Sequence, residues 1–204
     1  TNALRNRGYY FFRPEFIEYL ADSVENPGSI ALKMVLGSNV PSFALEPYRT
    51  GKVTVLVARN QGGGTPDTIA LPRATLIQMQ PSRLRHSTIA QALAFRPGRT
   101  FSVRTMDRTQ SQLARLGIFN AINIEVVPDT LAPAGERILD VNVYATFDTP
   151  LETSLEVNAS SKSNSYIGPG LTFGVTNKNI FGGGEQLSVK LTGSYEWQTG
   201  RSNH

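Results

Sequence analysis

The sequence of 204 residues predicts an α+β fold followed by a set of antiparallel strands, and two observations carry this prediction. Between residues 48 and 150, the hydrophobic patterns occur in the order strand, helix, helix, strand, strand. After Pro150 the helical periodicity stops, and only a two-residue alternation of apolar and polar side chains remains. We therefore expect two helices packed on one side of a small sheet, and a second sheet beyond it.

The chain also contains an internal repeat. Residues 4–10 (LRNRGYY) resemble residues 113–119 (LARLGIF), and the same offset carries Pro41 onto Pro150. A repeat of this kind indicates that one structural unit occurs more than once. We therefore expect the tail of one module to precede a complete copy of the same module. The same offset also carries Ile30, Leu32 and Met34 onto Leu139, Val141 and Val143.

The first part of the complete module is predicted to be extended. Residues 51–57 alternate apolar and polar side chains and are rich in β-branched residues, which predicts a strand. Residues 61–67 contain three successive glycines and a proline, which predicts a loop. A weaker extended run lies between Ile69 and Met79, and its pattern leaves its place in the module open.

Two helical patterns follow this extended part. Ser82 is placed to cap the first helix and Ser102 to cap the second, with a break at residues 96–99 (RPGR) between them. Gly117 stands where the second helix would end in a left-handed residue. The apolar side chains expected on the inner faces of the two helices are Ile89, Ala92, Leu93, Val103, Met106, Leu113 and Leu116.

Two strands close the module. Residues 122–126 carry apolar side chains at even positions and residues 139–145 at odd positions, so each strand has one buried and one wet face. The order of elements and the run from Leu113 to Phe119 resemble a POTRA domain. The resemblance implies that the edge strand receives extended client segments, through Ile122, Asn123, Ile124, Glu125 and Val126.

The tail contains three alternating runs, and the third is long enough for a membrane strand of about 9–11 residues. Small polar residues fill the second face of each run, as in a barrel lumen. An antiparallel sheet on a soluble core alternates in the same way, so the pattern alone leaves both interpretations open. The side chains that would face lipid are Leu155, Val157, Leu171, Phe173, Val175, Leu187, Val189, Leu191, Tyr195 and Trp197.

A second resemblance favours the membrane interpretation. Residues 167–171 (IGPGL) and 177–187 (NKNIFGGGEQL) look like the start of the barrel in BamA- and TamA-like proteins of the bacterial surface antigen family. This resemblance implies three parts. Residues 1–47 are the C-terminal part of a POTRA-like module, residues 48–150 a complete one, and residues 151–204 the first three or so strands of an outer-membrane β-barrel.

Several kinds of chemistry are not expected. The absence of cysteine excludes a disulfide framework and a thiolate metal site. His86 and His204 have no second ligand at metal spacing, and the Gly-rich stretches lack the lysine of a phosphate-binding loop. We therefore expect no enzyme, no cofactor and no metal.

Arginines are concentrated between residues 81 and 120, and the net charge of +4 permits an anionic partner. A solvated helix surface explains these arginines without any partner, and contact with anionic lipid headgroups or an acidic partner is the alternative. Nucleic acid is not expected because stacking aromatics are not interleaved with the arginines. The candidates for an anionic contact are Arg96, Arg99, Arg104 and Arg108.

The family resemblance implies a non-enzymatic assembly or insertion factor for outer-membrane β-barrel proteins. Its partners would be unfolded outer-membrane protein clients, outer-membrane lipid and accessory proteins. The POTRA-like part would lie in the periplasm and the barrel strands in the outer membrane. Two alternatives remain open at this point, a two-partner secretion transporter with the same kinds of domain and a soluble periplasmic binding module.

Overall fold

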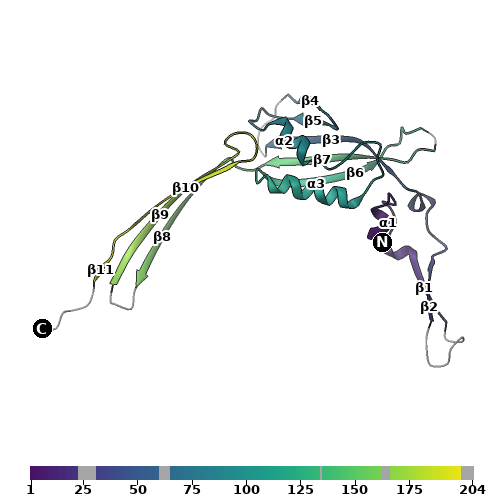
Figure 1. Cartoon of the computed structure of the whole chain (residues 1–204), viewed down its shortest axis with the longest axis horizontal. Coiled ribbons are helices and arrows are strands. Elements are labelled where there is room, and N and C mark those ends of the chain that lie inside the picture. Colours follow the sequence, from purple (N-terminus) through teal and green to yellow (C-terminus); the bar gives the residue numbers. More distant parts are fainter. Residues whose placement is uncertain (23–30, 60–64, 134, 162–165, 199–204) are drawn as a thin grey trace.

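A computed structural model describes residues 1–204 except residues 23–30, 60–64, 134, 162–165 and 199–204. An α/β unit occupies the middle of the molecule, a two-stranded ribbon extends from one side of it, and a second sheet extends from the other (Figure 1). The glycines of the predicted loop and His204 lie outside the described residues. No described helix is long and apolar enough to cross a membrane.

The α/β unit is built on a five-stranded mixed sheet with the order β4-β5-β3-β7-β6. The central strand β3 pairs in parallel with both β5 and β7, whereas β4 and β6 pair antiparallel with β5 and β7 and form the two edges. The strands of this sheet are β3 (Arg49–Arg59), β4 (Asp67–Leu71), β5 (Ala74–Gln78), β6 (Phe119–Pro128) and β7 (Ile138–Phe147).

Two helices cover one face of this sheet, and the core lies between them and the two central strands. Helix α2 (His86–Ala92) and helix α3 (Val103–Arg115) bury Ile89 and Leu113 completely against the inward side chains of β3 and β7. The predicted alternation of β6 and β7 is confirmed, because Ile122, Ile124 and Val126 pack against this core and their neighbours are exposed. The buried side chains of the central strands are Val53, Val55, Val57, Leu139, Val141, Val143 and Ala145.

The extended run between Ile69 and Met79, whose place was open, forms a hairpin of β4 and β5. The chain reverses at Pro72 and Arg73, between the paired residues Leu71 and Ala74. Strand β5 then adds to the free side of β3, where Leu76 is completely buried. The hairpin therefore widens the sheet beyond the three strands expected for the module.

The predicted caps of the two helices are wrong in their details. Helix α2 begins at His86, and the Ser82 hydroxyl instead accepts hydrogen bonds from the Gln78 side chain at 2.9 Å and from the Leu84 N–H at 3.4 Å. Ser102 does stand at the N-cap position of α3, but it makes no capping bond to that helix. The side-chain oxygen of Asn6 accepts from the Ser102 hydroxyl at 3.0 Å and from the Arg104 N–H at 2.9 Å. A residue from the start of the chain therefore caps α3.

Replacing Asn6 with alanine is expected to loosen the first turn of α3, because an N-cap bond contributes about 1 kcal/mol. Amide hydrogen exchange of residues 102–106, measured by mass spectrometry on the full-length protein, should become about fivefold faster. Asn2→Ala is the matched control, since Asn2 is exposed in the short helix α1 (Asn2–Arg5). Equal exchange in the two variants would show that Asn6 does not cap α3.

The N-terminal segment contains the same sequence of features as the end of the α/β unit. Gly8 follows α1 with φ of +99°, and Gly117 follows α3 with φ of +65°. The second value confirms the prediction that Gly117 ends its helix in a left-handed conformation. An antiparallel pair comes next in both places, here β1 (Ile17–Asp22) with β2 (Ala31–Leu36). The short 3-10 helices η1 (Pro14–Phe16) and η2 (Ser42–Leu45) flank this ribbon.

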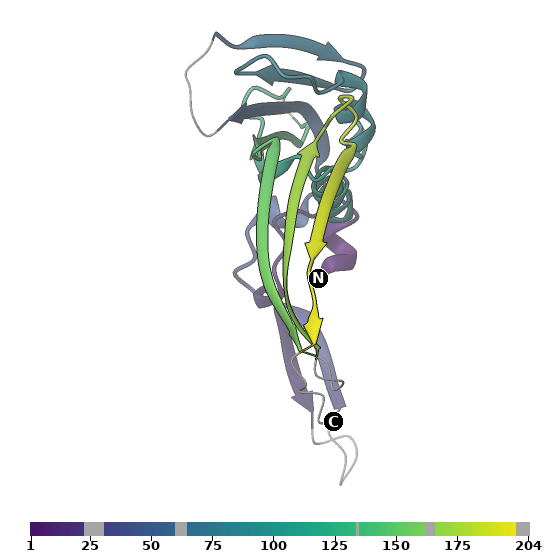
Figure 2. The ribbon, with the colours of Figure 1, turned by 90° about the vertical axis from the view of Figure 1, so that its left-hand side faces the viewer.

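The second sheet, which we call the arm, consists of β8 (Leu151–Ser161), β9 (Tyr166–Lys178), β10 (Gln186–Ser194) and β11 (Trp197–Gln198). Strand β9 lies in the middle, with β8 on one side and β10 and β11 on the other, all antiparallel to it. The three long strands run side by side as a curved sheet (Figure 2). Every residue of β8 and β10 is exposed, so the arm is not packed inside a soluble core in this structure.

Candidate functional site

The first candidate site is the open edge of the five-stranded sheet at β6. Among the described strands, β6 pairs only with β7. The Asp129 N–H donates to the Ile138 carbonyl at 3.0 Å, and the Asp148 N–H donates to the Ile118 carbonyl at 2.8 Å. Hydrogen-bonded pairs alternate along an antiparallel ladder, so the odd-numbered residues of β6 beyond its bulge bond to β7. The N–H and C=O groups of Ile122, Ile124 and Val126 therefore point to the open edge.

This register separates two properties of the predicted client-binding segment 122–126. The backbone groups of Ile122, Ile124 and Val126 are available at the edge, while their side chains pack toward the core. Asn123 and Glu125 have exposed side chains, but their N–H groups belong to the β7 ladder. An added strand would thus pair with main chain alone, which places little demand on its sequence.

The second candidate site is the apolar face of the arm. Residues paired directly across antiparallel strands have side chains on the same face. Leu155, Phe173 and Leu191 form one row across three strands, and Val175 with Val189 forms the next. Val157 pairs with Leu171, and Trp197 pairs with Ile167 at the far end. The register therefore brings the predicted lipid-facing residues of separate strands onto one face, and this face is exposed.

The opposite face of the arm is polar and internally hydrogen-bonded. The Thr172 and Thr192 hydroxyls lie 3.0 Å apart, and the Thr176 and Ser188 hydroxyls lie 2.9 Å apart. Glycines occupy other positions on this face, and a Cβ at Gly174 would lie 2.5 Å from the Ser154 hydroxyl. The arm thus has one apolar and one small, polar surface.

One predicted strand of the arm is interrupted. The alternation that includes Tyr195 and Trp197 does not form one strand, because β10 ends at Ser194 and β11 begins at Trp197. The Tyr195 carbonyl approaches Gly168 so closely that a Cβ there would lie 2.0 Å from it. The rings of Tyr195 and Trp197 still lie together, with their centroids 6.1 Å apart, at the end of the arm far from the α/β unit.

The arm has an open edge of its own at β8. The Lys178 N–H donates to the Pro150 carbonyl at 2.8 Å, so even-numbered residues of β8 bond to β9. The backbone groups of Leu151, Leu155 and Ala159 therefore face the open side, where no described strand pairs with β8. The β8 edge thus lies on the strand that directly follows the junction between the two sheets, whereas β6 is separated from this junction by β7.

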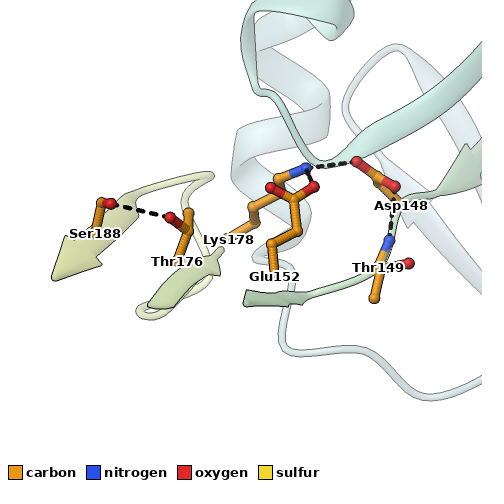
Figure 3. A network of polar contacts seen from close by, with 6 residues as sticks. All are labelled: Asp148, Thr149, Glu152, Thr176, Lys178 and Ser188. Carbon is orange, nitrogen blue, oxygen red and sulfur yellow. Dashed lines mark hydrogen bonds and ion pairs between the residues drawn. The ribbon is translucent and has the colours of Figure 1, made fainter. Parts of the chain in front are cut away.

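The junction, which we call the root of the arm, comprises residues 148–151 and 178–186. The Lys178 ammonium lies 2.6 Å from the Asp148 carboxylate and 2.5 Å from the Glu152 carboxylate (Figure 3). Asp148 also accepts the Thr149 N–H at 2.8 Å. The bond from Lys178, and then that from Thr149, lowers the pKa of the Asp148 carboxyl below its ordinary value. One cation therefore joins the last residues of the α/β unit to two strands of the arm.

The turn between β9 and β10 is packed against the α/β unit. The Arg85 N–H donates to the Gly182 carbonyl at 2.7 Å, and a Cβ at Gly182 would lie 2.3 Å from the Arg83 carbonyl oxygen. Gly182 and Gly184 both have positive φ, and Asn179 has φ of +66° with its side chain accepting the Gly184 N–H at 3.0 Å. The Gly-rich stretch at 182–184 thus forms a turn, and this turn attaches the arm to the segment before α2.

The predicted anionic-contact arginines lie mostly away from the root. Thr50 exchanges backbone hydrogen bonds with Gly98 and Arg99, which places the loop carrying Arg96 and Arg99 beside the start of β3. The root adjoins the other end of the sheet, where Arg59 pairs with Phe147. The nine residue steps along β7 correspond to about 30 Å. Arg104, in the first turn of α3, also lies at the distant end, and Arg108 lies farther along the same helix. All four are exposed.

Comparisons with known proteins identify a similar fold but no family. No family model and no curated protein matches the chain. The fold is similar to BamA from Haemophilus ducreyi lacking POTRA domains 1-3, with a TM-score of 0.52 and 14% identity over 96% of this chain and 29% of that one. CdiB from Acinetobacter baumannii gives a TM-score of 0.49 and 14% identity over 94% of this chain and 28% of that one. The first of these is an outer-membrane β-barrel protein, and the likeness to it, at 14% identity, concerns the fold alone.

Proposed function

We propose that this chain is part of a factor that assembles or inserts β-barrel proteins in the bacterial outer membrane. In this proposal the α/β unit is a POTRA-type module in the periplasm, and the arm is the first part of a membrane barrel. The observation that carries the proposal is the arm itself, which has an exposed apolar face, a small polar face and open edges. Such a sheet suits lipid on one side and a wet lumen on the other.

The dimensions of the arm support the same role. Strand β8 has 11 residues and would be about 36 Å long. At a tilt of about 45°, its height would be about 25 Å, which is the height of the apolar band of membrane barrels. Exposed aromatic residues mark both ends of this band, Phe181 at the root and Tyr195 with Trp197 at the far end. A strand of this kind satisfies its backbone in lipid only when further strands close the barrel.

The two open edges give this factor a way to handle many clients. An unfolded outer-membrane protein exposes extended segments with unpaired backbone groups, and such segments can add to a sheet edge. The β6 edge would receive these segments in the periplasm, and the β8 edge would present the lateral seam in the membrane. Pairing through main chain suits clients of different sequence and requires no catalytic residue.

Site-specific photo-crosslinking in living cells tests this function. A photoreactive residue at Asn123, exposed on β6, should crosslink to several newly made outer-membrane proteins during their assembly. The control position is Gln110, which is exposed on α3 away from the edge strand. A single secreted protein as the only adduct would indicate a secretion transporter instead, and the absence of any adduct at Asn123 would contradict a client-binding edge.

A further inference from the structure

The root of the arm contains a cavity of about 270 Å³ between the α/β unit and the turn that follows β9. Its polar side is formed by Arg59 at the end of β3, by Ser82 and Arg83 before α2, and by Asn177 and Lys178 at the end of β9. Its apolar side is formed by Ile118, Phe147 and Ile180. The cavity is therefore amphipathic, and three of its lining residues are cations.

The charges around this cavity are not balanced. Asp148 is the one carboxylate in the lining, and it is already bound by Lys178 at 2.6 Å. No carboxylate of the described residues forms an ion pair with Arg59 or Arg83, and both side chains are exposed. Glu185 lies close enough to Arg85 to interact with it, but it does not line the cavity. Two guanidinium groups are thus left to attract an anion, and planar guanidinium groups match phosphate oxygens well.

We propose that the root cavity binds the phosphate of an anionic phospholipid. This inference rests on the proposed function, because a barrel strand that starts at Leu151 places the root at the periplasmic surface of the outer membrane. Phosphate groups lie at that depth, and the apolar lining of Phe147 and Ile180 would accompany the first part of the acyl chains. Arg59 and Arg83 would hold the phosphate, and the exposed ring of Phe181 would lie in the adjoining interface.

The test uses the full-length protein purified from outer membranes in a neutral detergent. Native mass spectrometry measures how much phosphatidylglycerol, phosphatidylcholine or inorganic phosphate the protein retains when each is added alone. The wild type should retain phosphatidylglycerol selectively. The double variant Arg59→Gln/Arg83→Gln should bind it about 25-fold more weakly, because each basic residue near an anionic surface contributes about fivefold.

The matched control is Arg13→Gln/Arg73→Gln, which removes the same charge from two exposed residues that do not line the root cavity. This control should bind phosphatidylglycerol within about twofold of the wild type. Equal loss in both double variants, or equal retention of phosphatidylcholine, would overturn the inference in favour of unspecific attraction. Binding of inorganic phosphate as tight as that of the lipid would show a free-anion site and overturn the lipid assignment.

The failure of this inference is distinguishable from failure of the proposed function. Cell fractionation and the heat-dependent gel mobility of the purified protein report on the barrel and do not depend on the lipid. A heat-modifiable outer-membrane protein without selective phosphatidylglycerol binding would overturn the cavity assignment alone. A protein found outside the outer-membrane fraction would overturn both.

Discussion

Replacing Phe173 with arginine is expected to prevent the full-length protein from reaching its folded, heat-modifiable form in outer membranes. Phe173 lies near the middle of β9, with Leu155 and Leu191 directly beside it on the apolar face. A cation at the middle of the lipid-facing band costs about 2–4 kcal/mol, which is a large part of the stability of a typical domain. The fraction of protein with shifted gel mobility before heating measures the effect.

Thr172→Arg is the control for this variant, because it puts the same cation one residue away on the other face. There the neighbours are Glu156 and Thr192, in a row that would face the wet lumen. This variant should fold to nearly the wild-type fraction. Equal damage by both substitutions, or none by either, would mean that the two faces of the arm do not face lipid and water.

The alternation of side chains was sufficient to predict the three long strands of the arm, but not the break between β10 and β11. An exposed strand with one apolar face can be recognised from its own residues, because apolar and polar side chains must alternate along it. The sequence does not determine which residues of different strands pair. Phe173 pairs with Leu155 and Leu191, and this pairing joins the apolar side chains of three strands into one surface. Only the register of the strands in the structure shows it.

Contacts between distant segments were inaccessible to pattern analysis. The bond from Ser102 to Asn6 spans 96 residues. Ser102 therefore stands at the N-cap position that the sequence predicts, but the side chain that caps α3 is that of Asn6. Lys178 similarly meets Asp148 and Glu152 across 30 and 26 residues. The β4–β5 hairpin lacks a strong turn signal, because its reversal uses Pro72 and Arg73 rather than an Asn-Gly or Gly-rich pair. The one local signal for the root in the sequence was the charged residue Lys178 at the end of an alternating apolar run.

The site prediction at β6 was likewise sensitive to register. The strand and its alternation were predictable from residues 122–126, but the direction of each N–H was not. A proline at Asn123 looks like a test of client binding when only the sequence is known. In the structure this substitution removes a bond to β7, so it should weaken the α/β unit itself rather than its open edge.

Replacing Ile124 with proline is expected to weaken the binding of an extended client peptide by about 5- to 30-fold. The Ile124 N–H faces the open edge, so proline removes a donor to the incoming strand while leaving the β7 ladder intact. A lost donor that leaves a partner carbonyl unsatisfied costs about 1–2 kcal/mol, which corresponds to that range. Titration of the full-length protein with a labelled peptide from an outer-membrane protein strand, followed by fluorescence anisotropy, measures the change.

Ile124→Ala separates backbone from side-chain effects in this experiment, because Ile124 also packs against the core. Both variants lose that packing and should unfold at similar temperatures, but only the proline variant loses the edge donor. Asn123→Pro should show the reverse pattern, with a lower unfolding temperature because its N–H belongs to the ladder with Tyr144. If the proline and alanine variants of Ile124 bind the peptide equally, clients do not pair with the β6 main chain, and the open edge has another purpose.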